Sequence, residues 1–321
     1  MQAIELDVRV ARKTAEALDI CAFELVQPDG SALPAFSAGS HIDVRLPTGI
    51  TRQYSLCNDA SETHRYLIGV LRDPASRGGS RAMHEQVNEG DLLRIAVPRN
   101  HFALDEEAPH SLLLAGGIGI TPLLSMADKL AAAGRSFDMH YCTRSPERAA
   151  FRHRIAAAAF AGQVRFHFDD GLDAQKLDID RTLAAAPADT HLYVCGPKGF
   201  IDWVLARARG AGWTESRLHF EFFGAEVAPS ATDGAFDVKL ASSGRVIHVP
   251  ADRTVVQALS QAGVEIQVSC EQGVCGTCLT RVLDGEPEHK DLYLTPEEQA
   301  ANDQFTPCCS RSRSPVLVLD I

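Results

Sequence analysis

The N-terminal part of the chain alternates short apolar runs with turn residues, a pattern typical of antiparallel strands. The runs cover residues 43–46, 52–56, 66–71 and 92–97, and Pro and Gly residues lie between them. Pro and Gly favour chain reversal because of their backbone dihedral preferences. This pattern predicts a small antiparallel β-barrel over residues 1–108.

From residue 109 to residue 224 the pattern changes to strands that alternate with helices. Apolar runs occur at residues 111–115, 139–143, 164–168 and 191–195. After the first run we expect a helix with Thr121 as its N-cap, Pro122 at its first position and Gly134 beyond its end. Such alternation predicts a parallel sheet covered by helices, with its ligand at the carboxyl ends of the strands.

The last part of the chain follows a segment of small and helix-breaking residues at 225–235, which we expect to be a linker. Beyond it, residues 236–240 and 246–249 predict a hairpin, and residues 254–262 predict a short helix. A chain of 321 residues is too long for one ordinary core. We therefore expect a third domain over residues 236–321.

Composition restricts the possible partners and compartment. The chain is 45% hydrophobic and 23% charged, with a formal net charge of −11, which argues against nucleic acid or an anionic membrane as a partner. We find neither a membrane-spanning run nor a secretory signal in the sequence. Five cysteines outside the motif below are scattered through apolar surroundings, as in reduced proteins, so we expect a cytoplasmic protein.

Three cysteines lie within nine residues, at Cys270, Cys275 and Cys278, and Cys308 follows after twenty-nine intervening residues. This is the ligand spacing of a plant-type [2Fe-2S] cluster. Glycines between the cysteines can adopt the left-handed turns that wrap a compact inorganic core. The spacing predicts a protein that moves electrons one at a time.

A structural zinc site is the alternative interpretation, because four cysteines also suit tetrahedral zinc. Zinc frameworks usually pair their ligands in two Cys-x2–4-Cys knuckles, whereas here the fourth ligand is separate. Cys309 directly follows Cys308, and only one of the two can be the ligand. The register of the motif favours Cys308, with Cys309 as a buried thiol.

Two segments of the N-terminal domain contain groups suited to a phosphate. Arg52, Gln53, Tyr54 and Ser55 place a cation, an aromatic ring and a hydroxyl on one expected strand. The run from Arg77 through Gly78 and Gly79 to Ser80 exposes backbone N–H groups beside a guanidinium and a hydroxyl. Each segment is ordinary alone, but together they favour a phosphate site over a surface turn.

Two segments of the central domain suggest a nucleotide. The run from Gly116 to Pro122 lacks the third glycine and the later acidic residue of the dinucleotide fingerprint. Glycines before a capped helix still present free N–H groups to a pyrophosphate. Cys195, Gly196 and Pro197 end another expected strand, where a small thiol and a glycine would let a planar ring approach.

The ordered set of these motifs resembles the phthalate dioxygenase reductase family, which includes the reductase components of vanillate demethylases and related Rieske oxygenases. The set comprises Arg-x-Tyr-Ser, Arg-Gly-Gly-Ser, Gly-Gly-Ile-Gly-Ile-Thr-Pro, Cys-Gly-Pro, the segment 219–225 and the four cysteines, and it covers nearly the whole chain. The resemblance implies an FMN-binding barrel, an NADH-binding α/β domain and a C-terminal β-grasp ferredoxin.

The resemblance also implies roles for individual residues. Ser55 and Cys195, beside the flavin edge and the nicotinamide, are the expected catalytic residues. The expected FMN contacts are Arg52, Gln53, Tyr54, Ser55, Gly69, Val70, Leu71, Arg77, Gly78, Gly79, Ser80, Thr121 and Phe223. The expected nucleotide contacts are Gly117, Arg144, Cys195, Gly196 and Pro197. Ser145 stands where some relatives carry an acidic residue, so NADPH remains an alternative to NADH.

The implied activity is hydride transfer from NADH to FMN, followed by single-electron transfer through the [2Fe-2S] cluster to a Rieske-type terminal oxygenase. We expect a monomer. One alternative is an FAD-dependent reductase that serves another hydroxylase or a cytochrome P450. A second alternative, from a different class, is a redox sensor whose cluster governs an interaction.

Overall fold

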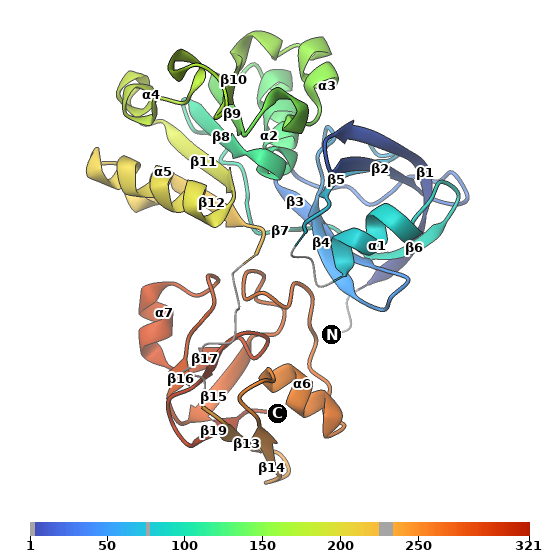
Figure 1. Cartoon of the computed structure of the whole chain (residues 1–321), viewed down its shortest axis with the longest axis vertical. Coiled ribbons are helices and arrows are strands. Elements are labelled where there is room, and N and C mark those ends of the chain that lie inside the picture. The colour runs from blue at the N-terminus through green and yellow to red at the C-terminus, as the bar shows by residue number, and fades with distance from the viewer. Residues whose placement is uncertain (1–3, 75–77, 225–233) are drawn as a thin grey trace. The chain divides into compact units, whose positions relative to one another are not determined.

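The computed structural model describes residues 4–74, 78–224 and 234–321, and it divides into two compact units, residues 1–223 and 224–321 (Figure 1). The first unit contains an antiparallel sheet and a parallel sheet, and the second contains a mixed sheet. Most of the expected linker, residues 225–233, lies outside the described residues. None of the helices within the described ranges is both long enough and apolar enough to cross a membrane.

The first sheet is antiparallel throughout, in the order β4-β3-β6-β1-β2-β5, with β7 paired to β3. Its elements are β1 (Glu5–Ala17), β2 (Ile20–Val26), β3 (Ser40–Arg45), β4 (Thr51–Ser55), β5 (Tyr66–Leu71), helix α1 (Gly79–Gln86), β6 (Leu92–Ala96) and β7 (Arg99–Asn100). One isolated bridge, between Leu56 and Ile68, connects the two ends of the sheet. The expected barrel is therefore closed by a single residue pair and not by a full ladder.

All four strands expected here are present, but the long hairpin of β1 and β2 was not predicted. Register shifts interrupt the pairing of β1 between Val10 and Arg12 and between Ala15 and Ala17. Because side chains alternate between faces, each shift reverses which residues point inward. The alternating pattern is thus lost from the sequence of β1, although Val8 and Val10 are buried in the core.

The second sheet is parallel, in the order β10-β9-β8-β11-β12, as the alternation of strands and helices predicted. Its strands are β8 (Ser111–Gly116), β9 (Phe137–Thr143), β10 (Val164–Phe168), β11 (His191–Gly196) and β12 (Leu218–Phe222). The α-helices are α2 (Ile120–Ala132), α3 (Arg152–Ala157), α4 (Ile179–Ala185) and α5 (Lys198–Gly210). Short 3-10 turns occupy residues Gly117–Gly119, Pro146–Arg148, Ala161–Gln163, Asp173–Gln175 and Glu215–Arg217.

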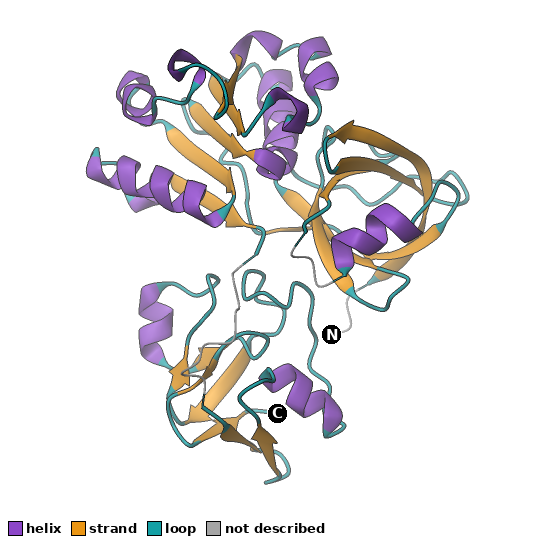
Figure 2. Cartoon of the chain, viewed as in Figure 1, coloured by secondary structure: helices purple, strands orange, loops and turns teal. Residues whose placement is uncertain are grey.

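Both faces of the parallel sheet are covered (Figure 2). Leu113 and Ala115 of β8 pack in a core with residues of α2 and α3. Leu112 and Leu114 of the same strand pack in a second core with residues of α4 and α5. Every residue of β8 is buried, which explains its continuous apolar sequence.

The start of helix α2 differs from the expectation. The helix begins at Ile120 after a 3-10 turn, so Gly119 is the N-cap and Thr121 lies inside the first turn. The Thr121 hydroxyl donates to the carbonyl oxygen of Ile118 at 3.0 Å. The prediction of Thr121 as N-cap is wrong because the glycine run tightens into a helical turn before it. Gly134, with a φ of 64°, follows the helix end as predicted.

The second unit is built around a sheet in the order β14-β13-β19-β15-β17, in which β13 and β19 are parallel. Its elements are β13 (Phe236–Leu240), β14 (Val246–Val249), α6 (Val255–Gln261), β15 (Thr280–Asp284), β16 (Pro287–Glu288), α7 (Pro296–Ala301), β17 (Gln304–Phe305), β18 (Arg311–Ser312) and β19 (Val316–Leu319). The expected hairpin and helix are present, and Thr254 and Gln257 form a capping box at the start of α6. The segment between α6 and β15 carries three of the motif cysteines.

Replacing Gly119 by Ala should destabilise the parallel-sheet region by about 1–3 kcal/mol. A Cβ at this position would overlap the carbonyl of Cys195 and lie 2.6 Å from the nitrogen of Gly196, and this backbone cannot easily move. Both tryptophans, at 203 and 213, lie in this part of the chain, so urea unfolding followed by their fluorescence measures the effect. Gly162→Ala, in open space, is the control. Equal midpoints for the two variants would contradict the expectation.

Candidate functional site

The structure brings the two predicted phosphate segments together. The Arg52 side chain on β4 lies against Gly79, where a Cβ would be 2.8 Å from the Arg52 Cγ. Gly78 adopts a left-handed φ of 105° and is the N-cap of α1. The Ser80 hydroxyl accepts from the Asp73 N–H at 3.1 Å. Arg77 lies outside the described residues.

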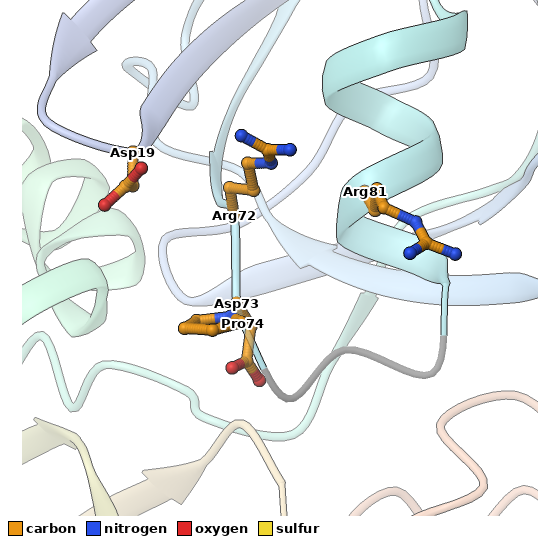
Figure 3. Close-up of a pocket in the computed structure, with 5 residues that line it drawn as sticks. All are labelled: Asp19, Arg72, Asp73, Pro74 and Arg81. Carbon is orange, nitrogen blue, oxygen red and sulfur yellow. The ribbon is translucent and has the colours of Figure 1, made fainter.

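A pocket of about 310 Å³ adjoins this region. Its lining residues are Asp19, Arg72, Asp73, Pro74 and Arg81, drawn in Figure 3. Arg72 follows β5 and Arg81 lies on α1, so two further cations flank the loop between these elements. Arg72 pairs with Glu85 at 2.6 Å, but both are about half exposed, and such pairs contribute little to stability. Neither arginine was predicted as a site residue, although Arg81 directly follows Ser80.

Residues expected at the flavin ring lie where the barrel meets helix α2. A Cβ on Gly69 would be 2.8 Å from Cγ2 of Thr121 and 3.1 Å from the Phe151 ring, so only glycine allows this approach of β5. The hydroxyl oxygen of Tyr54 is buried and has no hydrogen-bond partner among the described residues. An unpaired buried hydroxyl costs free energy unless a ligand or water satisfies it, which fits a polar group bound here.

Ser55, Cys195 and Glu221 form a group of three polar side chains. Cys195 on β11 is opposite Glu221 on β12 in the parallel pairing, and the Ser55 hydroxyl donates to the Glu221 carboxylate. Glu221 is half-buried as a residue, but its Oε2 is buried and unpartnered within the described part of the chain. Burial raises the pKa of Glu221 to about 8, and the bond from Ser55 opposes this shift.

Glu221 was missed as a site residue, although it lies in the quoted segment 219–225. The available signal was a lone carboxylate among aromatic residues at the end of a parallel strand. Cys195 is completely buried, and burial, with the charge of Glu221, raises the pKa of its thiol well above the ordinary value. A thiol in this environment stays protonated and does not act as a nucleophile.

The nucleotide candidates lie at the carboxyl ends of β8, β9 and β11. Gly117 has a φ of 54° and nothing within 4 Å of the position of a Cβ. Gly196 is packed against the backbone of Gly116, whereas Pro197 and Arg144 are exposed. Phe223, expected over the flavin, follows β12 and is 37% exposed.

The structure also supplies the carboxylates that the sequence after β9 lacks. The N–H of Asp170 donates to the carbonyl oxygen of Arg144 at 3.0 Å, and that of Asp169 donates to Thr143 at 3.1 Å. These bonds extend the pairing of β10 with β9 beyond the strand ends. Two exposed carboxylate residues therefore adjoin Arg144, although they are distant from it in sequence.

The four predicted cluster ligands are buried together in the second unit. The Cys270 thiol lies within hydrogen-bonding reach of the thiols of Cys275 and Cys308, and Cys308 also reaches Cys278. The Gln272 N–H donates to the Cys270 sulfur at 3.3 Å. Thiolates held in a buried loop with N–H donors fit an iron–sulfur cluster.

Within the described ranges, no three His, Cys, Asp or Glu side chains converge on a single-ion position. The Cys309 thiol also lies within reach of the Cys308 thiol, contacts the Thr306 hydroxyl at 3.1 Å and packs against Gly273.

Comparisons with known proteins agree with this geometry. Residues 238–313 match a 2Fe-2S iron-sulfur cluster binding domain, and residues 96–218 match the N-terminal domain of dimethylamine monooxygenase subunit DmmA-like proteins. A vanillate O-demethylase oxidoreductase of Pseudomonas putida is 57% identical over 98% of this chain and 100% of its own length. The solved structure of phthalate dioxygenase reductase, described as a modular structure for electron transfer from pyridine nucleotides to [2Fe-2S], is 40% identical. The two structures superpose over 99% of this chain and 98% of the reductase chain, with a TM-score of 0.81.

The chain belongs to the phthalate dioxygenase reductase family. It is an oxidoreductase with a [2Fe-2S] domain, as the resemblance of its motifs indicated. Members of the family share the flavin-binding sheet, the α/β sheet and the C-terminal ferredoxin domain seen here. An intact self-sufficient cytochrome P450 monooxygenase is 39% identical, but this chain spans only 41% of that chain.

The stability of the first unit should fall as pH rises from about 5 to about 8, in part because of Glu221. Native Glu221 keeps a proton that the unfolded chain releases above about pH 4.5, so the native state binds more protons in this window. As pH rises from about 5 to about 8, the free energy of unfolding of Glu221→Gln should therefore increase by about 3 kcal/mol relative to that of the unsubstituted protein. Urea unfolding at several pH values measures the gain, and Glu107→Gln, an exposed site, is the control. Parallel pH profiles for the Glu221 variant and the unsubstituted protein would contradict it.

Proposed function

We propose that this protein takes a hydride from NADH onto FMN and passes single electrons through a [2Fe-2S] cluster to a Rieske-type terminal oxygenase. The observation that carries the proposal is the joint presence of a glycine turn at the start of α1, a covered parallel sheet and four buried thiols in one chain. The similar P. putida protein is named for vanillate O-demethylation, so an aromatic O-demethylase is the favoured system. We further propose a cytoplasmic monomer.

In this proposal each part of the chain has one task. Residues 1–108 bind FMN, residues 109–224 bind NADH, residues 225–235 connect, and residues 236–321 hold the cluster. When bound, FMN accepts electrons in pairs and releases them singly, which matches a two-electron donor to a one-electron cluster. Cys270, Cys275, Cys278 and Cys308 are the proposed ligands, and Cys309 is not.

The chain's own residues bind and orient. Arg52, Arg81 and the N–H groups at the start of α1 offer positive charge to a phosphate dianion. Gly117 borders open space, which leaves room for a planar group. Ser55 is oriented by its bond to Glu221, whose pKa of about 8 keeps this carboxyl group neutral at pH 7. No general acid or base is required of these residues.

Asp169 and Asp170 favour NADH over NADPH. Carboxylates beside the ribose accept a hydrogen bond from a 2′-hydroxyl and repel a 2′-phosphate. Because these carboxylates follow β10 and not β9, they support a preference for NADH although Ser145 is not acidic.

A second candidate is a reductase that serves a cytochrome P450, and the similarity to the self-sufficient P450 favours it. Acid extraction and chromatography of the bound flavin distinguish FMN from FAD. Electron transfer to purified oxygenase components, with vanillate turnover as the readout, tests the favoured partner. Absence of flavin bleaching by NADH would instead support a redox sensor.

Cys275→Ser should abolish the cluster's visible absorbance and the NADH-dependent reduction of cytochrome c. NADH-dependent ferricyanide reduction should persist, since it needs only the flavin. Cys309→Ser is the matched control, because its sulfur contacts Thr306 and Gly273, and it should keep both activities. Loss of both activities in Cys275→Ser, or loss of the cluster in Cys309→Ser, would contradict these assignments.

The double substitution Asp169→Asn with Asp170→Asn should raise kcat/KM for NADPH by about tenfold, equivalent to about 1.4 kcal/mol. The reason is the loss of repulsion toward a 2′-phosphate. Steady-state ferricyanide reduction with each coenzyme measures the change. Asp173→Asn, at a fully exposed carboxylate nearby, should leave it unaltered. An unchanged preference in the double variant would refute the role of these residues.

A further inference from the structure

A buried carboxylate lies against the cysteine loop, and the functions assigned above leave it unused. The Asp291 side chain is completely buried. Its Oδ2 accepts from the Leu294 N–H at 2.8 Å, and its Oδ1 accepts from the Ser310 hydroxyl at 3.3 Å. His289 Nδ1 lies 3.5 Å from the same Oδ1. Both oxygens face donors, which satisfies the hydrogen-bonding capacity of a buried carboxylate.

Asp291 also touches both segments that carry the cysteines. Gly273 lies between Cys270 and Cys275, and its carbonyl oxygen accepts from the Leu292 N–H at 2.9 Å. A Cβ on Gly273 would lie only 3.0 Å from Cα of Asp291, so the two backbones are in close contact.

The other segment is held through Ser310, two residues beyond Cys308. Besides donating to Asp291, the Ser310 hydroxyl accepts from the Lys290 N–H at 3.2 Å and contacts the Thr306 hydroxyl at 3.0 Å. Ser310 and Thr306 are both buried, so these bonds are shielded from water. Asp291 therefore lies between the loop with three ligands and the segment with the fourth.

We propose that Asp291 is a positioning residue for the cluster ligands and that its buried negative charge makes the cluster harder to reduce. Reduction adds an electron to a centre already surrounded by thiolates, and a nearby negative charge opposes it. A buried charge is screened by salt much less than an exposed one. The proposal rests on the proposed cluster site.

Two variants of the full-length protein test it. Asp291→Asn keeps the shape and one acceptor oxygen for the Leu294 N–H, turns an amide N–H toward the Ser310 hydroxyl, and removes the charge. Asp291→Glu keeps the charge. The cluster potential is measured by dye-mediated reductive titration followed by visible absorbance and electron paramagnetic resonance. Asp291→Asn should raise the equilibrium constant for reduction about tenfold, or about 59 mV for a one-electron couple. Asp291→Glu should remain near the unsubstituted protein.

Asp303→Asn is the matched control, because Asp303 is an exposed carboxylate of the same unit. Asp303→Asn should shift the cluster potential less than Asp291→Asn does, and its shift should vanish at high salt. The shift caused by Asp291→Asn should persist at high salt. A cluster potential in Asp291→Asn equal to that of the unsubstituted protein overturns the proposal.

If Asp291→Asn does not retain a cluster, the Asp291→Glu variant tests the proposal. A cluster in Asp291→Glu at the original potential supports the proposal, whereas loss of the cluster in both variants overturns the role of charge. Absence of a [2Fe-2S] spectrum in the unsubstituted protein would instead refute the proposed function itself, so the two failures are distinguishable.

Discussion

The close approach of backbones at glycine positions is the constraint on which the candidate site depends. At the carboxyl edge of the parallel sheet, Gly119 lies against the carbonyl of Cys195, and Gly196 lies against Gly116. At the boundary with the barrel, Gly69 leaves room for Thr121 and Phe151. Any side chain at these positions would push apart the start of α2, the end of β11 and the edge of β5. These are the elements whose ends carry the flavin and nucleotide candidates.

The same constraint governs the second unit. Gly273 and Gly276 both adopt left-handed backbone conformations, and a Cβ on either would overlap a neighbouring side chain, Cys309 or Tyr293. The loop can therefore turn tightly enough to bury three cysteines within nine residues. In both units, close backbone packing at glycines positions the loops and strand ends that carry the candidate site residues.

The two units contain buried carboxyl groups in opposite environments. Glu221 has an unpartnered oxygen, and burial raises its pKa to about 8, so the site beside Cys195 stays neutral at pH 7. Asp291 instead has a hydrogen-bond donor facing each of its oxygens. A neutral environment suits residues that only orient planar groups, whereas a fixed charge influences the energy of a centre that gains one electron.

Features that depend on local spacing and periodicity could be predicted before the structure was known. Continuous apolar runs predicted the parallel sheet, the pattern at 236–249 predicted the hairpin, and the cysteine spacing and ordered motifs predicted the cluster and the family. Strand β1 was not predicted, because bulges erase the alternation on which strand prediction relies. Tertiary structure alone placed Glu221 beside Ser55, Asp170 beside Arg144 and Asp291 beneath Gly273. These contacts join residues on different strands and loops, and their energies come from burial, which no local pattern in the sequence encodes.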